Sequence, residues 1–344
     1  MGPGGESWIH EAWGTMVQPL ASTMPYHVTV GNHEWDHTGS GWPTDADRAG
    51  WAKGQYGEDS GGDCGIPYIR RFQMPNGTSS SVAAAANSST HMASPTEEAQ
   101  PPAAAAVAAK AMGDGAKAAK AARAARAVEN QTPATVAAAV DDGPKQYYSL
   151  DIGPVHFVVL SIETDFGNAS AQLGWLDRDL AATDRSRTPW VIVAHHRMIW
   201  LDALGAPSAL ESHMQQTLEP LYIEHGVDLV LSGHAHTYAR HCAMRHGVCQ
   251  TDAGGLAPGL RRQHTRHTQN APVYIVDGTA GAYTGGGNQG VSCTQPTDNT
   301  PPTLARDCMW GWSRMAVNRT ALHWEHLRWT GNVSDEVVLR KGQR

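Results

Sequence analysis

The chain has 344 residues, 41% of them hydrophobic, and a net charge of −7 with histidine neutral. This length allows one large globular domain or two ordinary ones, and the lack of a basic surplus argues against nucleic acid as a partner. No apolar run approaches the roughly 20 residues that span a bilayer, so no membrane partner is expected. The 18 histidines are the informative count, because imidazole is the usual neutral ligand of borderline metals.

The first segment, residues 1–78, has the composition of a folded enzyme, with many Trp, Gly and Pro residues. Residues 9–20 predict a short amphipathic helix, and residues 26–30 predict a strand that runs into Gly31. Its first residues show no charged start followed by an apolar stretch, so no signal peptide is visible.

Residues 79–142 are rich in alanine and almost free of large apolar side chains. Such a segment cannot bury enough surface to offset its ordering entropy, so it predicts a disordered insertion within one domain formed by 1–78 and 143–344. Basic side chains recur every three residues between Lys117 and Arg126. A tolerated surface insertion explains this strip, and a role as an interaction segment is the alternative.

Secondary structure is again expected from Gln146 onward. Amphipathic runs predict helices at 171–182 and 211–225, and apolar runs predict strands at 147–151, 155–162, 190–194, 227–232 and 273–276, with further strands within 313–340. The first two strands form a hairpin through Gly153-Pro154. Strands that alternate with helices predict an α/β layered sheet.

The five cysteines include two close pairs, Cys242/Cys249 and Cys293/Cys308, and each pair could form a disulfide that closes a short loop. Cys64 would then have no disulfide partner. Five reduced cysteines remain an open alternative, because the compartment is not known.

Three polar turns follow apolar strands. The first is Gly31-Asn32-His33-Glu34, in which an Asn side-chain oxygen is a neutral hard ligand. His33 would point elsewhere in the turn, toward a substrate. An Asx turn with a surface histidine is the alternative.

The second turn, His195-His196-Arg197, follows the strand at 190–194. Neighbouring side chains of an extended chain face opposite sides, so only one of these two histidines can face a given cleft.

The third turn is Gly233-His234-Ala235-His236, after the strand at 227–232. The spacing of two residues places both imidazoles on one side of an extended turn, and Gly233 lets the backbone turn sharply. This pattern is the most specific indication of a metal site in the chain.

In this order the three turns resemble the later motifs of the calcineurin-like metallophosphoesterases, GNH[DE], a strand-end His and GHxH. The flanking segments 19–30, 59–68 and 218–240 are similar to those of purple acid phosphatases, in particular the large plant and algal members. Outside the insertion, the resemblance covers nearly the whole chain. It implies a layered αββα sandwich that hydrolyses phosphate monoesters at acid pH.

The resemblance also implies roles for single residues. Asn32, His196 and His234 correspond to ligands of one metal, and His236 corresponds to a ligand of the other. His196 is preferred over His195 because it occupies the place of the family's single histidine. His33 matches the histidine that contacts phosphate and protonates the leaving group.

Intact relatives hold a dinuclear centre of Fe(III) with Zn(II), Mn(II) or Fe(II). A secreted or vacuolar location is the expectation from the family, and it fits five Asn-x-Ser/Thr sequons, at Asn76, Asn87, Asn168, Asn318 and Asn332.

The chain departs from the family in one respect. Relatives carry an Asp motif and a GDxxY motif before GNHE, whereas no residue before Gly31 is an Asp. The domain is therefore expected to lack its N-terminal strands, and the four remaining ligands are all neutral. Two nearby cations repel one another, and a bridging carboxylate normally offsets this repulsion. Because the remaining ligands include no carboxylate, we expect at most a single, weakly held divalent metal. The alternative function is a catalytically silent domain that binds metal or phosphate. Oligomeric state is not predicted.

Overall fold

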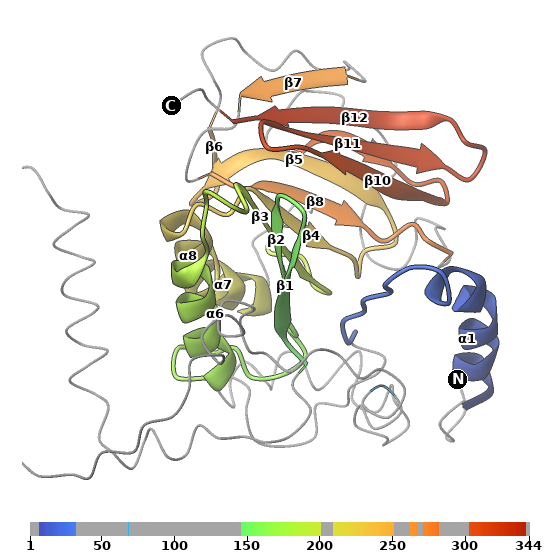
Figure 1. Cartoon of the computed structure of the whole chain (residues 1–344), viewed down its shortest axis with the longest axis horizontal. Coiled ribbons are helices and arrows are strands. Elements are labelled where there is room, and N and C mark those ends of the chain that lie inside the picture. The colour runs from blue at the N-terminus through green and yellow to red at the C-terminus, as the bar shows by residue number, and fades with distance from the viewer. Residues whose placement is uncertain are drawn as a thin grey trace, which may run out of the picture. The chain divides into compact units, whose positions relative to one another are not determined.

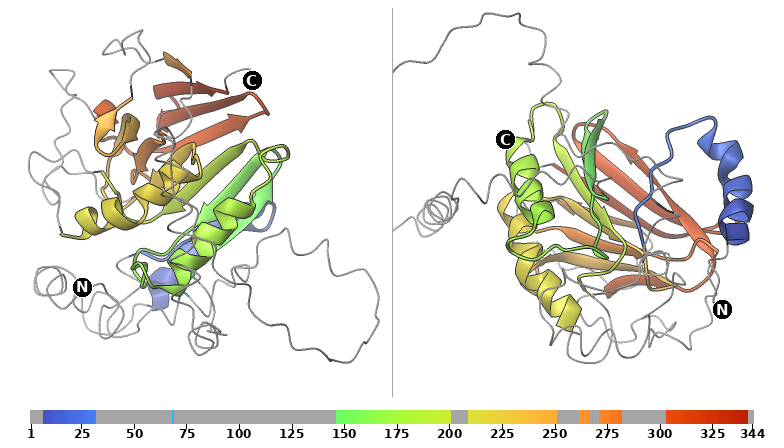
Figure 2. Two further views of the ribbon diagram at one scale, coloured as in Figure 1. Left: turned by 90° about the vertical axis from the view of Figure 1, so that its left-hand side faces the viewer. Right: turned by 90° about the horizontal axis from the view of Figure 1, so that it is seen from below.

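The structure is a computed structural model that describes residues 7–31, 68, 146–200, 209–250, 262–266, 271–281 and 303–341 (Figures 1 and 2). The predicted insertion at 79–142 lies outside these ranges, so the domain organisation stays a prediction.

An eight-stranded sheet forms the centre of this part of the chain. Its middle is parallel, and antiparallel strands lie on both sides. Across the sheet the strands are β1 (Tyr148–Ile152), β2 (Val155–Val159), β3 (Trp190–His195), β4 (Leu229–Ser232), β8 (Val273–Asp277) and β5 (Tyr238–Arg245), with β6 (Val248–Cys249) and β9 (Thr303–Asp307) both paired to β5. The predicted strands in this region are confirmed, including the hairpin, in which Gly153 adopts a φ of 54°.

A second sheet has four strands in the order β10 (Gly311–Val317), β11 (Ala321–Arg328), β12 (Val333–Arg340) and β7 (Arg262–Arg266). The first three form an antiparallel meander, and β7 runs parallel to β12. The meander confirms the strands expected within 313–340.

Three helices lie together on one side of the eight-stranded sheet (Figures 1 and 2). The helix α6 (Ala171–Ala182) has the predicted bounds, and the Ser170 side chain caps it by accepting from the Leu173 amide at 3.1 Å. The helical structure expected over 211–225 is confirmed, and it consists of two helices, α7 (Ala209–Thr217) and α8 (Glu219–Glu224). Pro220 lacks the amide hydrogen needed to continue the first helix and instead occupies the first turn of the second.

Alternation along β3 builds two apolar cores. Val191 and Val193 pack in one buried cluster with residues of the three helices. Trp190 and Ile192 pack in another cluster with Trp324 and other residues of the second sheet. A strand that is apolar on both faces is typical of a parallel strand buried between two layers. The described layers are therefore helices, sheet and sheet, and the predicted α/β sandwich class is confirmed.

The N-terminal helix α1 (Ser7–Ala21) is confirmed, but the strand predicted at 26–30 is wrong. The segment is held by side chains instead of a backbone ladder. The Val28 carbonyl accepts from the Tyr148 hydroxyl at 3.1 Å and from the Tyr68 hydroxyl at 3.2 Å. The Thr29 hydroxyl donates to the Leu160 carbonyl at 2.9 Å. These bonds anchor the chain just before Gly31.

Of the expected disulfides, Cys242–Cys249 is confirmed and joins β5 to β6. Cys308 is also disulfide-bonded, and Cys293 and Cys64 lie outside the described residues. Within the described ranges, no helix is long and apolar enough to cross a membrane.

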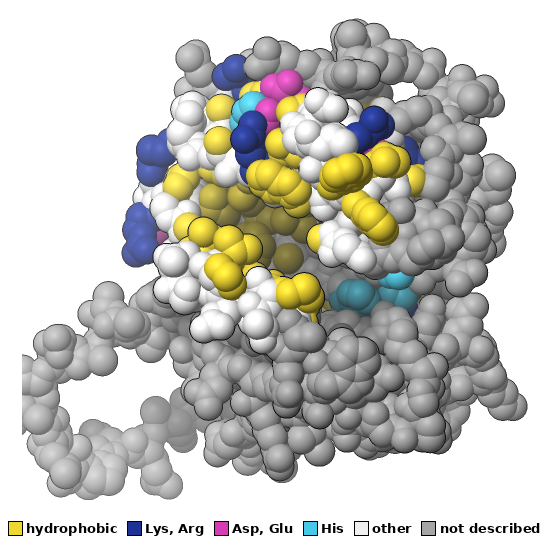
Figure 3. Space-filling view, turned by 90° about the vertical axis from the view of Figure 1, so that its right-hand side faces the viewer, with side chains coloured by type: hydrophobic (Ala, Val, Ile, Leu, Met, Phe, Trp, Pro, Cys, Tyr) yellow, Lys and Arg dark blue, Asp and Glu magenta, His cyan; other side chains and the backbone are white. Residues whose placement is uncertain are grey.

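The surface carries large apolar side chains at the start of β10 and the end of β11. Trp310, Trp312 and Trp329 are 49%, 50% and 66% exposed, and the Trp329 amide donates to the Trp310 carbonyl at 2.7 Å. Figure 3 shows hydrophobic side chains gathered around a hollow on one face of the protein, with histidine side chains reaching the surface beside them.

Candidate metal centre

The candidate site is built where three neighbouring parallel strands end. β2, β3 and β4 run side by side, with His195 of β3 in register with Ser232 of β4. The Gly233 amide then donates to the His196 carbonyl at 2.9 Å, which extends the pairing by one step. Because the carboxyl ends of parallel strands share one edge of the sheet, His196 and His234 are brought together although 38 residues separate them.

The two imidazoles present nitrogens to one another. His234 Nδ1 lies 3.1 Å from His196 Nε2, and the rings are nearly perpendicular, with centroids 5.0 Å apart. Two nitrogens each about 2.1 Å from one ion, at an angle of about 90–110°, would be separated by about 3.0–3.4 Å. The pair therefore fits two adjacent ligands of a single metal.

The backbone at His234 is held in an unusual conformation. Its φ is 62°, in the left-handed region that non-glycine residues seldom occupy. Such strain costs about 1–3 kcal/mol and is found mostly at functional sites. Here it turns the chain directly after β4 and aims the ring at His196.

His195 is separated from this pair. Its side chain is 2% exposed, its Nδ1 lies 2.5 Å from the Arg197 carbonyl, and its ring stacks on Tyr222 with centroids 6.4 Å apart. Burial lowers its pKa to about 4, so it is a neutral core histidine. This placement agrees with the choice of His196 over His195, although the ligand role of His196 stays a prediction.

His236 lies in the same loop as His234, and its side chain is exposed. The backbone of this loop packs closely against Gly278, the residue that follows β8. A Cβ added to Gly278 would lie 2.0 Å from the Ala235 carbonyl oxygen and 3.4 Å from His236 Cα. Only glycine allows this close approach, which fixes the backbone that carries both histidines.

Asn32 and His33 lie outside the described residues, so their predicted roles are neither supported nor contradicted. Gly31 is the last described residue before Asn32. Val30 is fully buried, and Thr29 is bonded to Leu160, directly after β2. The described segment therefore reaches Gly31 next to the sheet edge where His196 lies.

Glu163 and Arg197 were missed by sequence reasoning. Arg197 Nε and Nη2 donate to the two carboxylate oxygens of Glu163 at 2.6 and 3.0 Å, and the side chains are 2% and 1% exposed, respectively. Arg197 Nη1 lies 3.5 Å from His234 Nε2. Both residues follow apolar strands, which is the same signal that identified the histidines, but a carboxylate and a guanidinium were not sought together.

A polar network lies beyond the loop. The Thr237 hydroxyl donates to the Asp307 carbonyl at 2.9 Å, and Asp277 at the end of β8 accepts from Ser313. Burial alone would raise the pKa of Asp277, but bonds from His326 and Ser313 hold that pKa below its usual value. Thr237 therefore ties the loop to β9, and Asp277 links β8 to β10 of the second sheet. Among the described residues, a group of three nearby His, Cys, Asp or Glu ligands occurs on the second sheet and not at the His196–His234 pair.

Comparison with known proteins identifies the family of the chain. The family model described as Calcineurin-like phosphoesterase matches residues 128–238, and the one described as Iron/zinc purple acid phosphatase-like protein C matches residues 271–336. The fold and the motifs thus define a calcineurin-like phosphoesterase.

Curated relatives narrow the assignment. The chain is 32% identical over 278 residues to "Probable inactive purple acid phosphatase 9" of Arabidopsis thaliana. The aligned region covers 80% of this chain and 32% of that protein. It is 29% identical over 243 residues to an "Acid phosphatase" of Aspergillus ficuum, covering 57% of this chain and 37% of that protein.

A solved purple acid phosphatase, PPD1 from yellow lupin (Lupinus luteus) seeds, shares the fold with a TM-score of 0.59 and 21% identity. That match covers 97% of this chain and 44% of the lupin chain. The chain belongs to the purple acid phosphatase family, and it spans about a third of the length of the curated relatives it matches.

Proposed function

We propose that this chain binds a divalent transition metal through His196 and His234 and carries part of the site of a metal-dependent acid phosphatase that acts on phosphate monoesters. The observation that carries the proposal is the 3.1 Å approach of His234 Nδ1 to His196 Nε2. Asn32 and His236 are the further ligands that the family resemblance implies.

The residues of the chain suit this role. Imidazole nitrogens and an amide oxygen are ligands for zinc, manganese and iron, and each is neutral when it binds. A bound metal would activate water and neutralise charge on a phosphoryl group. His33 would contact the phosphate and supply a proton to the leaving oxygen, which requires its protonated form and favours acid pH. The buried Glu163–Arg197 ion pair lies beside His234 and supports the edge of the sheet that carries it.

A catalytically silent metal-binding domain is the second candidate. Several relatives are named probable inactive purple acid phosphatases. The proposed ligands Asn32, His196, His234 and His236 are also all neutral, so nothing in this set offsets the repulsion between two cations. This candidate predicts metal binding without phosphate release.

The test compares two variants of the full chain, His234→Asn and His246→Asn. Both histidines have a left-handed backbone, with φ of 62° and 51°, and asparagine tolerates that conformation. The side chain of His246 is 61% exposed, so its variant controls for the loss of an imidazole. Zn²⁺ affinity and stoichiometry are measured by titration calorimetry, and phosphate release from an aryl phosphate is measured with Zn²⁺, Mn²⁺ or Fe³⁺ present.

We expect His234→Asn to weaken Zn²⁺ binding about tenfold or more, with no change in His246→Asn. Metal-dependent phosphate release that His234→Asn abolishes supports the phosphatase. The silent domain predicts the same loss of binding without any phosphate release. Equal Zn²⁺ binding by both variants would refute both candidates.

A further inference from the structure

A buried polar contact between the β1–β2 hairpin and helix α6 is made through one histidine. His156 of β2 lies directly opposite Asp151 of β1 and is 5% exposed. Its Nδ1 lies 2.8 Å from Asp151 Oδ1, and its Nε2 lies 2.9 Å from Asp179 Oδ2 on α6. One imidazole therefore joins both strands of the hairpin to the helix.

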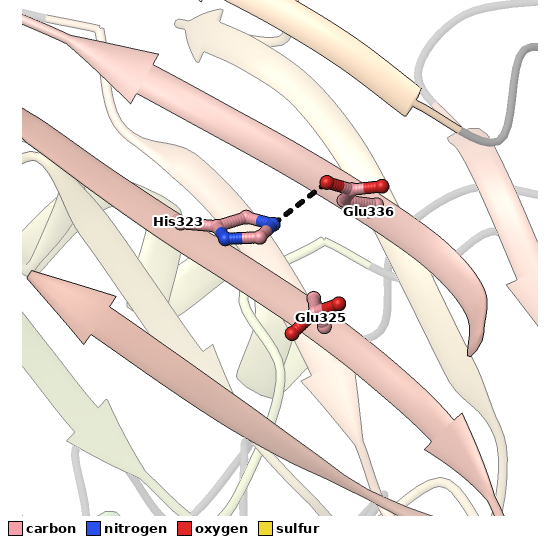
Figure 4. A group of neighbouring side chains, drawn as sticks. All are labelled: His323, Glu325 and Glu336. Carbon is pink, nitrogen blue, oxygen red and sulfur yellow. Dashed lines mark hydrogen bonds and ion pairs between the residues drawn. The ribbon is translucent and has the colours of Figure 1, made fainter. Parts of the chain in front are cut away.

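The positions of the two carboxylates determine which form of this ring fits. An ionised carboxylate only accepts hydrogen bonds, and a neutral imidazole has one N–H group and one lone pair. A single contact, such as the 2.8 Å between His323 Nε2 and Glu336 Oε1 on the second sheet (Figure 4), is satisfied by either form of the ring. At His156 a neutral ring would turn its lone pair toward one of the carboxylates, whereas the imidazolium donates to both.

The surroundings of His156 balance its positive charge. Within the described ranges two charged groups act on it, Asp179 from α6 and Asp151 from β1, and β3 places an apolar side chain in register with it. Asp179 also accepts from the Ser149 hydroxyl at 2.8 Å, and Asp151 accepts from the exposed Arg187 at 2.9 Å. The group with a protonated ring is neutral overall. Loss of the ring proton would leave a net negative charge, with Asp179 only 3% exposed.

The same contacts set the pH range over which His156 stabilises the fold. Burial alone would lower the pKa of His156, but the hydrogen bonds to Asp179 and Asp151 and the charges of both carboxylates raise that pKa above its usual value. A histidine whose pKa is raised on folding stabilises the folded state below its usual pKa. This stabilisation is lost as the pH rises through the higher pKa of the folded state.

The hairpin also carries the anchors of the segment that leads to Gly31. Tyr148 on β1 donates to the Val28 carbonyl, and Leu160, directly after β2, accepts from the Thr29 hydroxyl. A change that loosens the hairpin from α6 would therefore also act on this segment.

We propose that His156 is a pH-sensitive lock, in which its imidazolium holds the β1–β2 hairpin against α6 at acid pH and the loss of its proton loosens the hairpin at alkaline pH. The lock would keep the segment before Gly31 anchored under acid conditions. It depends neither on the proposed phosphatase activity nor on a bound metal.

The first measurement uses the natural full chain. A ¹H–¹⁵N correlation spectrum of the histidine side chains distinguishes an imidazolium from both neutral tautomers. At about pH 6.5, where an ordinary histidine is half protonated, we expect His156 to carry a proton on both ring nitrogens and to lose one of them at higher pH. A neutral His156 ring at pH 6.5 would overturn the proposal. This measurement needs no variant, so it decides the question even if a substituted chain fails to fold.

The second measurement compares His156→Gln with Thr183→Val. The Thr183 hydroxyl donates to the Asp179 backbone carbonyl at 3.1 Å, so the control weakens the same helix and leaves the His156 contacts in place. Hydrogen exchange of residues 148–159 and 171–182 is followed from pH 5 to pH 9, and protection factors are corrected for the intrinsic effect of pH on exchange.

The ratio of protection in the natural chain to protection in His156→Gln is expected to fall as the pH rises, because the natural chain alone loses the lock. The ratio to Thr183→Val should stay constant. Comparing ratios removes the titration of other groups, since these are present in every chain. A ratio to His156→Gln that does not change with pH would refute the lock.

Discussion

Arg197 Nε lies 2.6 Å from Glu163 Oε1, and this ion pair is buried at the sheet edge that also carries His234. Removing two charges from water is costly, and a pair that loses one member leaves an uncompensated buried charge. Glu163→Gln is therefore expected to lower the free energy of unfolding by about 3–5 kcal/mol, measured by urea denaturation.

The control for this prediction is Arg187→Gln, which breaks the Arg187–Asp151 pair at 2.9 Å, where the arginine side chain is 69% exposed. Exposed pairs contribute about 0–1 kcal/mol. A Glu163→Gln variant no less stable than Arg187→Gln would show that the buried pair is not important for stability.

A second prediction concerns Glu219, which is 2% exposed and accepts a hydrogen bond from the His246 amide at 3.1 Å. Burial raises the pKa of its carboxyl group from 4.5 to about 7. Between these two pH values the folded state binds more protons than the unfolded state, so the chain loses stability as the pH rises from about 4.5 to 7.

Glu219→Gln keeps the bond to the amide and has no charge to bury. Its stability relative to the natural chain should therefore be greater at pH 8 than at pH 5, by about 2–3 kcal/mol. Urea denaturation of both proteins at the two pH values measures this difference. The same relative stability at pH 5 and pH 8 would mean that Glu219 titrates normally.

A third prediction concerns the contact of Gly278 with the histidine loop. The added Cβ of Gly278→Ala would meet the Ala235 carbonyl oxygen at 2.0 Å, so one of the two backbones must shift. Overpacking of this kind costs about 1–3 kcal/mol, and displacement of the loop should also weaken Zn²⁺ binding at His234.

The matched glycine is Gly14, in α1, where nothing lies within 4 Å of an added Cβ. Gly14→Ala should leave Zn²⁺ binding unchanged and stabilise the helix by up to about 1 kcal/mol. Unfolding curves and Zn²⁺ titrations of both variants separate the two cases. A Gly278→Ala protein with normal stability and normal Zn²⁺ binding would contradict the close packing.

Elements that depend on interactions between neighbouring residues were predicted from the sequence, whereas an element that depends on contacts with distant residues was not. The helix at 171–182 and the strand at 190–194 were predicted closely because their apolar patterns lie within the segments themselves. The strand expected at 26–30 was wrong, because its carbonyl at Val28 is taken by the hydroxyl of Tyr148, 120 residues away. The helical structure at 211–225 was predicted, but its division into two helices at Leu218 was not, although Pro220 indicates it locally.

The sequence alone determined the family and the identity of the candidate ligands, because the GNHE, His-His-Arg and Gly-His-Ala-His turns can be recognised from neighbouring residues. The tertiary structure decided which side chains share a site. It separated His195 from His196, placed the Glu163–Arg197 pair beside His234, and set His156 between Asp151 and Asp179. The physical reason is that a side chain at a strand end points where strand order and register direct it, and those depend on pairing between segments far apart in the chain.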